Sequence, residues 1–257
     1  NYGLKLRGKN ASYVMERGTL IHAALATYYN ARKSGVAHIA ATLEAYKTLN
    51  ELAATSPVFD PITLGIECFK LLAEYFDFYG DEDMEVLAVE TEYLIPITDD
   101  FSLQVRIDLV KRQNGRVIVE DHKVLYNFYS DKKIGLEGQL PLYLAGLRTE
   151  GFKVDEVAYN MIRHRGDAVD RFRRQTVPIT AKRVVTTLEE HLRASNRIAS
   201  LRAKGLEGWR SVILRNAKEC DGCPYTLLCE AELNGQDTRG LIEYEYAPKT
   251  HRQEMNV

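Results

Sequence analysis

The first 80 residues place apolar side chains at the three- and four-residue spacing of amphipathic helices. This spacing predicts helices over residues 16–33, 36–54 and 60–80, and Gly80 supplies a stop for the third. The apolar positions of that third helix are Ile62, Ile66, Phe69, Leu72, Ala73 and Phe76. The pattern therefore predicts a helical cover at the amino-terminal end.

From residue 85 the pattern changes to β-branched residues with the two-residue alternation that is typical of strands. We expect three strands within residues 85–123, a further strand over residues 154–162 and another over residues 172–179. We expect these strands to form a central sheet.

Two more helices are expected among and after these strands. One covers residues 138–147, where Pro141 is tolerated in the first turn. The other is a long basic helix over residues 181–204, for which Thr180 is a suitable cap. After the cysteines at residues 220–229 we expect a polar, irregular tail.

The order of helices, strands, helix, strand and helix indicates an α/β fold: a mixed sheet with a helical cover. At 257 residues the chain is long enough to bury one substantial core. We divide it into a helical region over residues 1–84, a core over residues 85–205 and a cysteine-rich segment with its tail over residues 206–257. We expect the three parts to form one compact unit.

The composition is that of an ordinary globular protein, with 45% hydrophobic and 27% charged residues. No stretch approaches the roughly 18–20 consecutive apolar residues that span a bilayer, and no secretory signal is visible. We therefore expect an intracellular, cytoplasmic protein without a membrane partner. The net charge of −2 gives no overall signal for binding to nucleic acid.

Positive charge is nevertheless concentrated in one short segment, residues 163–174. Such a run is often only a solvated face, and it can also bind the phosphates of a nucleic acid. Its basic residues are Arg163, His164, Arg165, Arg171, Arg173 and Arg174.

Two adjacent segments, over residues 106–110 and 117–123, predict a pair of strands that carries the most informative chemistry of the chain. Asp108 lies in the first segment and Asp121 in the second. The turn residues between the segments are Gln113, Asn114 and Gly115.

Side chains alternate between the two faces of a strand, so Asp121 and Lys123 share one face while Glu120 and His122 share the other. Buried carboxylates next to an amine are unfavourable unless a cation or a partner charge compensates them. Together with Asp108, this set is suited to holding a hard divalent cation and activating water. The alternative is a surface hairpin with ordinary ion pairs.

Two helical segments add side chains to this picture. His22 follows Gly18 in a helix of small apolar residues, and its ring could complete a cation site, more naturally for manganese than for magnesium. Gln139 and Tyr143 lie four residues apart and share one helix face, where they could position a water, a phosphate oxygen or the neighbouring lysine. The alternatives are a half-buried structural histidine and a core tyrosine beside a surface glutamine.

Three of the four cysteines fall within ten residues, as Cys220, Cys223 and Cys229. A CxxC pair with a third thiolate nearby suits zinc or an iron–sulfur cluster, and Gly222 and Pro224 permit the tight turn. Disulfides are the alternative, but thiols stay reduced inside cells.

The sequence does not identify the fourth ligand of this metal or cluster. Cys68 lies among apolar residues of the third predicted helix and is interpreted as a small core residue. A ligand upstream of Asn1 is the other candidate, because the chain does not begin with methionine.

Five segments occur in an order that resembles the RecB-like branch of the PD-(D/E)XK nuclease superfamily, especially the small exonucleases of CRISPR adaptation and their phage relatives. They span residues 18–229, and only the ordered set is specific. The segments are GTLIH with His22, RIDLV with Asp108, VEDHK with Asp121 and Lys123, QLPLY with Gln139 and Tyr143, and CDGCPYTLLC.

The resemblance implies a restriction-endonuclease-like sheet flanked by helices and a role for each motif. His22, Asp108 and Asp121 would hold Mg²⁺ or Mn²⁺, and Lys123 would be the catalytic amine. Either Glu90 or Glu92 could add a carboxylate, and the sequence does not say which faces inward.

By the same resemblance, the Gln139/Tyr143 helix would support the DNA or the lysine, and Cys220, Cys223 and Cys229 would bind a [4Fe–4S] cluster. The sequence departs from the family in one respect: no cysteine precedes His22, where the family usually has its first cluster ligand.

The leading hypothesis is a Mg²⁺- or Mn²⁺-dependent DNA exonuclease that acts on single-stranded ends, in the host cytoplasm if a phage encodes it. The arginines at 163, 165, 171, 173 and 174 would contact the DNA backbone. A second hypothesis is a non-catalytic module that binds nucleic acid or a partner protein and keeps the cluster as a structural part. A weaker third is a structural zinc protein in which the acids are incidental.

Overall fold

The computed structural model divides the chain into two compact units. The larger unit comprises residues Tyr13–Ser56 and Asp60–His191, and the smaller comprises Asn1–Ser12, Pro57–Phe59 and Leu192–Val257. The structure describes residues 6–8, 12–58, 60–98, 101–167, 170–205, 220 and 223–248. The boundaries expected after residues 84 and 205 stay predictions.

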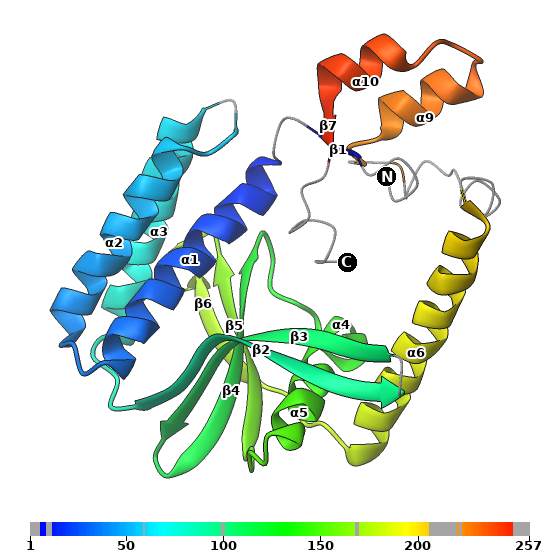
Figure 1. Cartoon of the computed structure of the whole chain (residues 1–257). Helices are drawn as coiled ribbons and strands as arrows, with labels where there is room; N and C mark the ends of the chain where they lie inside the picture. The colour runs from blue at the N-terminus through cyan, green and yellow to red at the C-terminus, as the bar shows by residue number, and fades with distance from the viewer. Residues whose placement is uncertain are drawn as a thin grey trace. The chain divides into compact units, whose positions relative to one another are not determined.

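The three helices predicted at the beginning of the chain are confirmed, as α1 (Tyr13–Lys33), α2 (His38–Ala54) and α3 (Pro61–Tyr79). The side chain of Asp60 caps α3 by accepting a backbone N–H, with Pro61 in the first turn. Gly80 ends α3 with a φ of 60°, a conformation that glycine adopts more readily than other residues. Figure 1 shows the three helices side by side.

A five-stranded sheet forms the centre of the larger unit, in the order β2-β3-β4-β5-β6. All neighbouring strands are antiparallel except β4 and β5, which run parallel. The strands are β2 (Glu85–Thr98), β3 (Phe101–Gln113), β4 (Arg116–Leu125), β5 (Glu156–Arg163) and β6 (Phe172–Thr176). The mixed sheet with flanking helices confirms the predicted α/β class.

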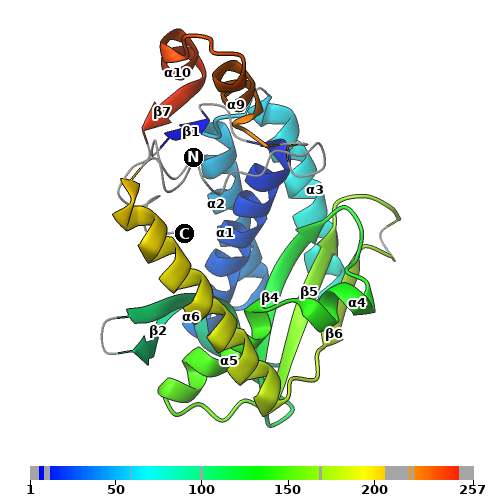
Figure 2. The same cartoon turned by 90° about the vertical axis from the view of Figure 1, so that its right-hand side faces the viewer.

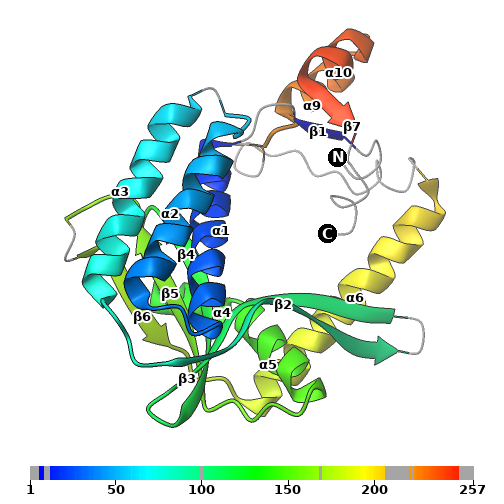
Figure 3. The same ribbon diagram turned by 60° about the vertical axis from the view of Figure 1, so that its left-hand side comes forward.

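Helices cover the sheet on two faces (Figures 1 and 3). Helices α4 (Asp131–Leu136) and α5 (Gln139–Thr149) pack on one face, where Tyr143 of α5 contacts Asp121 of β4. Helices α1 and α3 pack on the other, where the ring of Tyr29 stacks on His122. Because consecutive residues of β4 point to opposite faces, Asp121 and His122 contact different helices.

One glycine permits the close packing of α5 on the sheet. A Cβ at Gly146 would lie 2.8 Å from Cγ2 of Val105 in β3, so a larger residue would displace the helix. Helix α6 (Ala181–Ala203) begins at the predicted cap, where the Thr180 hydroxyl accepts the N–H of Arg183 at 3.2 Å. The guanidinium of Arg183 donates to the carbonyls of Ile134 and Glu137, which ties the start of α6 to the α4–α5 connection (Figure 2).

The prediction of an irregular tail after residue 229 is wrong. Two short helices, α9 (Thr226–Leu233) and α10 (Arg239–Glu245), are followed by strand β7 (Tyr246–Pro248), which pairs antiparallel with β1 (Leu6–Gly8). The buried Tyr246 stabilises these elements, because its ring stacks on Tyr225 and its hydroxyl donates to the Pro224 carbonyl. Among the described residues, every helix is too short or too polar to span a bilayer.

Candidate active site

The site begins where the pairing of β3 with β4 ends. The ladder between these strands closes with Leu109 opposite Glu120, and Asp108 lies one residue beyond. There Oδ2 of Asp108 accepts the backbone N–H of His122 at 2.8 Å. A buried N–H needs an acceptor, and the carboxylate replaces the strand carbonyl that would otherwise provide one. Asp108 is thereby fixed, 7% exposed, at the fork between the two strands.

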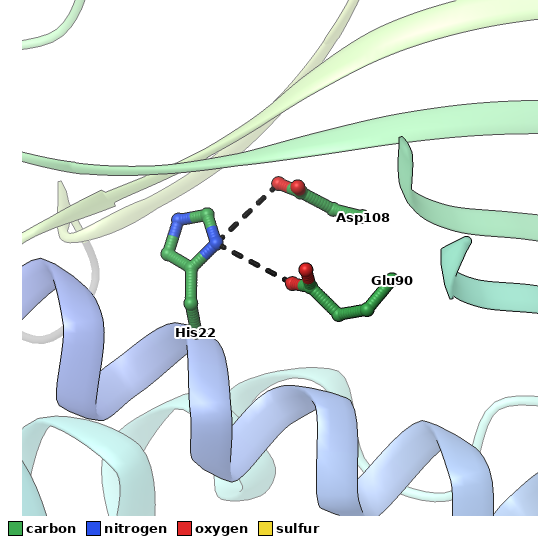
Figure 4. Close-up of side chains that lie close together, drawn as sticks. All are labelled: His22, Glu90 and Asp108. Carbon is green, nitrogen blue, oxygen red and sulfur yellow. Dashed lines mark ion pairs between the residues drawn. The ribbon is translucent and has the colours of Figure 1, made fainter. Parts of the chain in front are cut away.

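Three side chains from three elements converge beside this fork (Figure 4). Nδ1 of His22 in α1 lies 3.5 Å from Oδ2 of Asp108 in β3 and 3.9 Å from Oε1 of Glu90 in β2. One ligand atom from each residue lies within 4.8 Å of the other two. The histidine is placed by its helix, because the preceding Leu20 and Ile21 are buried and leave His22 at the rim of the core. One imidazole and two carboxylates form a donor set that suits a divalent cation.

Of the two glutamates left open by the sequence, Glu90 faces the site. Glu92 is exposed and accepts a hydrogen bond from Gln104 at 2.7 Å. Glu90 has a φ of 45°, which is unusual for a residue other than glycine, and this turn of the backbone redirects its side chain. Backbone strain of this kind is concentrated at functional sites. Nε of Arg106 lies 3.0 Å from the second oxygen of Glu90 and holds that side chain in place.

A second group of side chains forms a closed hydrogen-bonded ring on the α5 face of β4. Nζ of Lys123 lies 2.7 Å from Oδ2 of Asp121 and donates to Oε1 of Gln139 at 2.6 Å. Nε2 of Gln139 donates to the hydroxyl of Tyr143 at 2.8 Å, and that hydroxyl donates to Oδ1 of Asp121 at 2.9 Å. Each of the four residues contacts the next, so the ring fixes the orientation of both the amine and the carboxylate.

The electrostatics of the two groups are coupled through their carboxylates. Burial raises the pKa of Asp108 to about 7, with a further increase from the charge of Asp121. Burial likewise raises the pKa of Asp121, against the opposing effect of Lys123. Two buried acids with raised pKa values in one region indicate a site that favours added positive charge.

The basic groups of the site respond to the same carboxylates. Burial alone lowers the pKa of His22, but the neighbouring carboxylates of Glu90 and Asp108 more than compensate, so the pKa rises. Burial also lowers the pKa of Lys123, and the adjacent Asp121 reverses the effect, so the net direction is upward. Without a cation, the lysine is therefore held as an ammonium ion.

The structure places the predicted site residues in two adjoining groups rather than in one. His22 and Asp108 share the first group with Glu90, which the sequence named only as one of two options. Asp121 lies in the second group, and both of its oxygens already have partners there. Its assignment as a ligand together with His22 and Asp108 stays a prediction.

The opposite face of β4 carries buried charges that are structural. The amine of Lys111, fully buried, lies 2.7 Å from Oε1 of Glu120. Nε of Arg174 lies 3.4 Å from the other oxygen of Glu120, and the same guanidinium pairs with Glu82. Arg174 also covers the ring of Tyr79 at 3.8 Å. This packing leaves Arg174 within the fold, so the structure does not favour its predicted contact with nucleic acid.

The other predicted nucleic-acid-binding arginines fall into two classes. Arg171 pairs with Glu74 at 2.5 Å. Arg163, Arg165 and Arg173 instead lie over aromatic rings that follow β4. The segment is therefore partly structural and partly an outward-facing basic surface.

The cysteines predicted to bind a cluster belong to the smaller unit. The N–H of Cys223 donates to the carbonyl of Cys220 at 3.1 Å, and the hydroxyl of Thr226 donates to both cysteine carbonyls. Cys229 follows within α9. Asp221 and Gly222 of this motif lie outside the described residues. Within the described ranges, the three thiols do not meet within 4.8 Å as a three-ligand group.

Cys68 does not resemble a metal ligand. It is fully buried in α3 of the larger unit, and burial raises the pKa of its thiol to about 12. A thiol so resistant to ionisation behaves as a small core residue.

Comparison with known proteins identifies the family of the chain. The family model of the PD-(D/E)XK nuclease superfamily matches residues 1–230. No curated protein matches the chain. Among solved structures, one titled "Crystal structure of SSO0001" is 16% identical, with 88% of each chain covered and a TM-score of 0.38. A likeness at this TM-score supports no conclusion about the fold or the activity of this chain.

Proposed function

The chain belongs to the PD-(D/E)XK nuclease superfamily, and from this premise we propose that it is a metal-dependent DNA exonuclease that acts on single-stranded ends. The observation that carries the proposal is the pairing of Lys123 with Asp121 beside the converging His22, Glu90 and Asp108. A carboxylate and an amine two residues apart, next to a set of metal-binding donors, are the parts that phosphodiester hydrolysis requires.

The residues present fit a divalent cation. His22, Glu90 and Asp108 offer one nitrogen and two carboxylate oxygens within 4.8 Å, and Asp121 lies close enough to raise the pKa of Asp108. We propose that His22, Asp108 and Asp121 hold Mg²⁺ or Mn²⁺, with Glu90 as an additional ligand. The mixed nitrogen and oxygen donors suit manganese better than magnesium. A cation bound there would lower the pKa of a bound water and offset the charge of the scissile phosphate.

Lys123 has a defined task in this proposal. Its ammonium group donates to Asp121 and Gln139, and this ring holds the amine at a fixed position 20% exposed to solvent. A fixed cation at this position can orient the attacking water or stabilise the negative charge that develops on the phosphate. Gln139 and Tyr143 act as positioning residues, because they contact the lysine and the carboxylate rather than the reacting atoms.

The choice of single-stranded ends is supported by the basic surface beside β4. Arg163 is the last residue of β5, the strand next to Lys123, and Arg165 follows it. Arg173 lies near the start of β6, which pairs with β5. Guanidinium groups on aromatic rings are suited to binding a flexible strand by its phosphates.

For the smaller unit we propose a [4Fe–4S] cluster bound by Cys220, Cys223 and Cys229, with zinc as the alternative. The hydrogen-bonded turn between Cys220 and Cys223 supports a metal-binding CxxC pair. Iron in elemental analysis with absorption near 400 nm is the expected result; stoichiometric zinc without iron would overturn the cluster.

The test of the nuclease proposal is cleavage of end-labelled oligonucleotides with Mn²⁺ by wild-type protein and by Asp108→Ala and Lys123→Ala. We expect both variants to lose at least about 100-fold in rate, the lower end for removing a catalytic group. Lys132→Ala, which removes an exposed lysine outside the ring, is the matched control. Undiminished cleavage by either site variant would refute the assignment. A wild-type protein that binds DNA and cuts none with either metal would favour the non-catalytic alternative.

A further inference from the structure

The segment directly after β4 brings aromatic rings to the end of the sheet next to the candidate active site. Tyr126 and Phe128 follow Leu125, the last residue of β4, and Lys123 lies three residues before Tyr126. Because β4 and β5 are parallel, Leu125 lies opposite Arg163, the last residue of β5. The carboxyl ends of parallel strands are where open α/β sheets bind their ligands.

Each of these rings contacts a guanidinium group. Arg165 lies 4.7 Å from the centroid of the Tyr126 ring and donates to its hydroxyl at 3.0 Å. Arg173 and Arg163 lie 4.3 and 5.2 Å from the centroid of the Phe128 ring. Attraction between a cation and an aromatic ring holds each arginine side chain in place. The positions of three positive charges are thus fixed by two rings.

Most of these residues are exposed to solvent. Tyr126 is 55% exposed, and both Arg165 and Arg173 are exposed, while Phe128 is partly buried against the core and anchors the group. In the described ranges no carboxylate lies within ion-pair distance of Arg163, Arg165 or Arg173, in contrast to the pairing of Arg171 with Glu74. Arg165 lies on the exposed ring of Tyr126, while Arg163 and Arg173 lie on Phe128 two residues further along. An exposed ring beside this positive charge fits a ligand that has both phosphates and flat apolar faces.

We propose that Tyr126 stacks an unpaired base of single-stranded DNA while Arg163, Arg165 and Arg173 contact the flanking phosphates. Bases in a duplex already stack on their neighbours, so an exposed ring that stacks a base selects an unpaired strand. The inference rests on the proposed nuclease function and extends it, because it names the residue that distinguishes single from double strands.

The experiment is fluorescence anisotropy with a labelled 20-nucleotide single strand and the matching duplex, in EDTA so that nothing is cut. Tyr126→Ala should weaken binding of the single strand by about 5- to 150-fold, the range for losing one stacked base, and change duplex binding less than about twofold. Tyr126→Phe keeps the ring and loses only the hydroxyl to which Arg165 donates, so it should weaken binding of the single strand less than Tyr126→Ala does. Tyr244→Ala removes a 78% exposed tyrosine of the smaller unit and is the matched control.

The arginines have a separate readout. Arg173→Gln should weaken binding and lower the slope of log K against log salt by about 0.7, the value for one phosphate contact with a single strand. An unchanged slope would overturn its phosphate contact. Tyr126→Ala protein that binds the single strand as tightly as wild type, or that loses single strand and duplex equally, would overturn the stacking site.

Failure of this inference and failure of the nuclease proposal give different results. Cleavage of the same oligonucleotide is measured separately with Mn²⁺. Wild-type protein that shows the Tyr126-dependent preference and cuts nothing overturns the nuclease activity and supports the stacking site. Wild-type protein that cuts, while Tyr126→Ala binds normally, overturns the stacking site alone.

Discussion

The hydroxyl of Tyr143 donates a 2.9 Å hydrogen bond to Oδ1 of Asp121, and this bond closes the ring that holds Lys123. The donor direction is fixed by the rest of the ring, because the same hydroxyl already accepts a hydrogen bond from the amide of Gln139. Loss of the hydroxyl would leave both the carboxylate oxygen and the amide without this partner. Buried polar groups left without a partner are unfavourable by about 1–3 kcal/mol.

Tyr143→Phe should therefore lower kcat by up to about 100-fold, the range for a slightly misplaced catalytic group, with little change in KM for DNA, since the hydrogen-bonded ring positions catalytic groups and does not bind the strand. Steady-state cleavage with Mn²⁺ measures the two constants. Tyr159→Phe is the matched control, because its buried hydroxyl has no hydrogen-bond partner among the described residues. Equal effects of the two substitutions, or a rise in KM alone, would contradict a positioning role for Tyr143.

Glu90→Gln should weaken Mn²⁺ binding, because it replaces one of the two carboxylates that converge with the imidazole of His22 at the fork. Because Glu90 would be a direct ligand, we expect a loss in metal affinity of at least about 10- to 100-fold, the range for losing a residue that only supports a ligand. Isothermal titration calorimetry measures the affinity without any need for activity. Glu92→Gln, two residues along the same strand and exposed, is the control and should bind Mn²⁺ as wild type. Equal affinities for the two variants would remove Glu90 from the site.

Much of the site follows from the periods of helix and strand. The two-residue period of β4 places Asp121 and Lys123 on one face, and the structure joins them in an ion pair. The four-residue spacing of Gln139 and Tyr143 places both on one face of α5, and the structure joins them by a hydrogen bond. Local periodicity was sufficient in both cases because each pair lies within one regular element.

Glu90 could not be distinguished from Glu92 by the same reasoning. The two residues are two apart, so a regular strand would place both on one face. The φ of 45° at Glu90 breaks that regularity, and a single sequence carries no signal for it, since positive φ is not a property of glutamate. The tail was mispredicted for a related reason. Its short helices depend on Tyr246 and on the pairing of β7 with β1, residues at opposite ends of the sequence.

The buried charges behind the site give a stability prediction. Glu120→Gln leaves the fully buried Lys111 without its carboxylate and removes one of the two carboxylate partners of Arg174. We expect a loss of about 3–5 kcal/mol in the free energy of unfolding, the range for breaking a buried ion pair from one side. Lys111→Met should cost less, because Glu120 keeps Arg174. Urea denaturation measures both, and a larger loss for Lys111→Met would contradict this order.

The raised pKa of Asp108 predicts how stability depends on pH in metal-free protein. The folded-state pKa of about 7 lies above the usual value of 3.8, so the protonated carboxyl stabilises the fold fully below about pH 4. That contribution is lost as the pH rises through 7, and Asp121 and His22, whose pKa values are also raised, act in the same direction. The shift at Asp108 corresponds to at most roughly 4 kcal/mol.

Denaturation in EDTA between pH 4 and pH 8 should therefore show a smaller decline for Asp108→Asn than for wild type, because the amide does not titrate. A bound cation requires a deprotonated Asp108 carboxylate and a neutral His22 imidazole, so Mn²⁺ binding near pH 6 should release protons from both groups. Calorimetry in buffers of different ionisation enthalpy counts the released protons, and Asp108→Asn should release fewer. The prediction would be contradicted if the free energy of unfolding changed with pH in the same way in both proteins and metal binding released no proton. Asp108 would then already be ionised in the metal-free site, and burial at the fork would not raise its pKa.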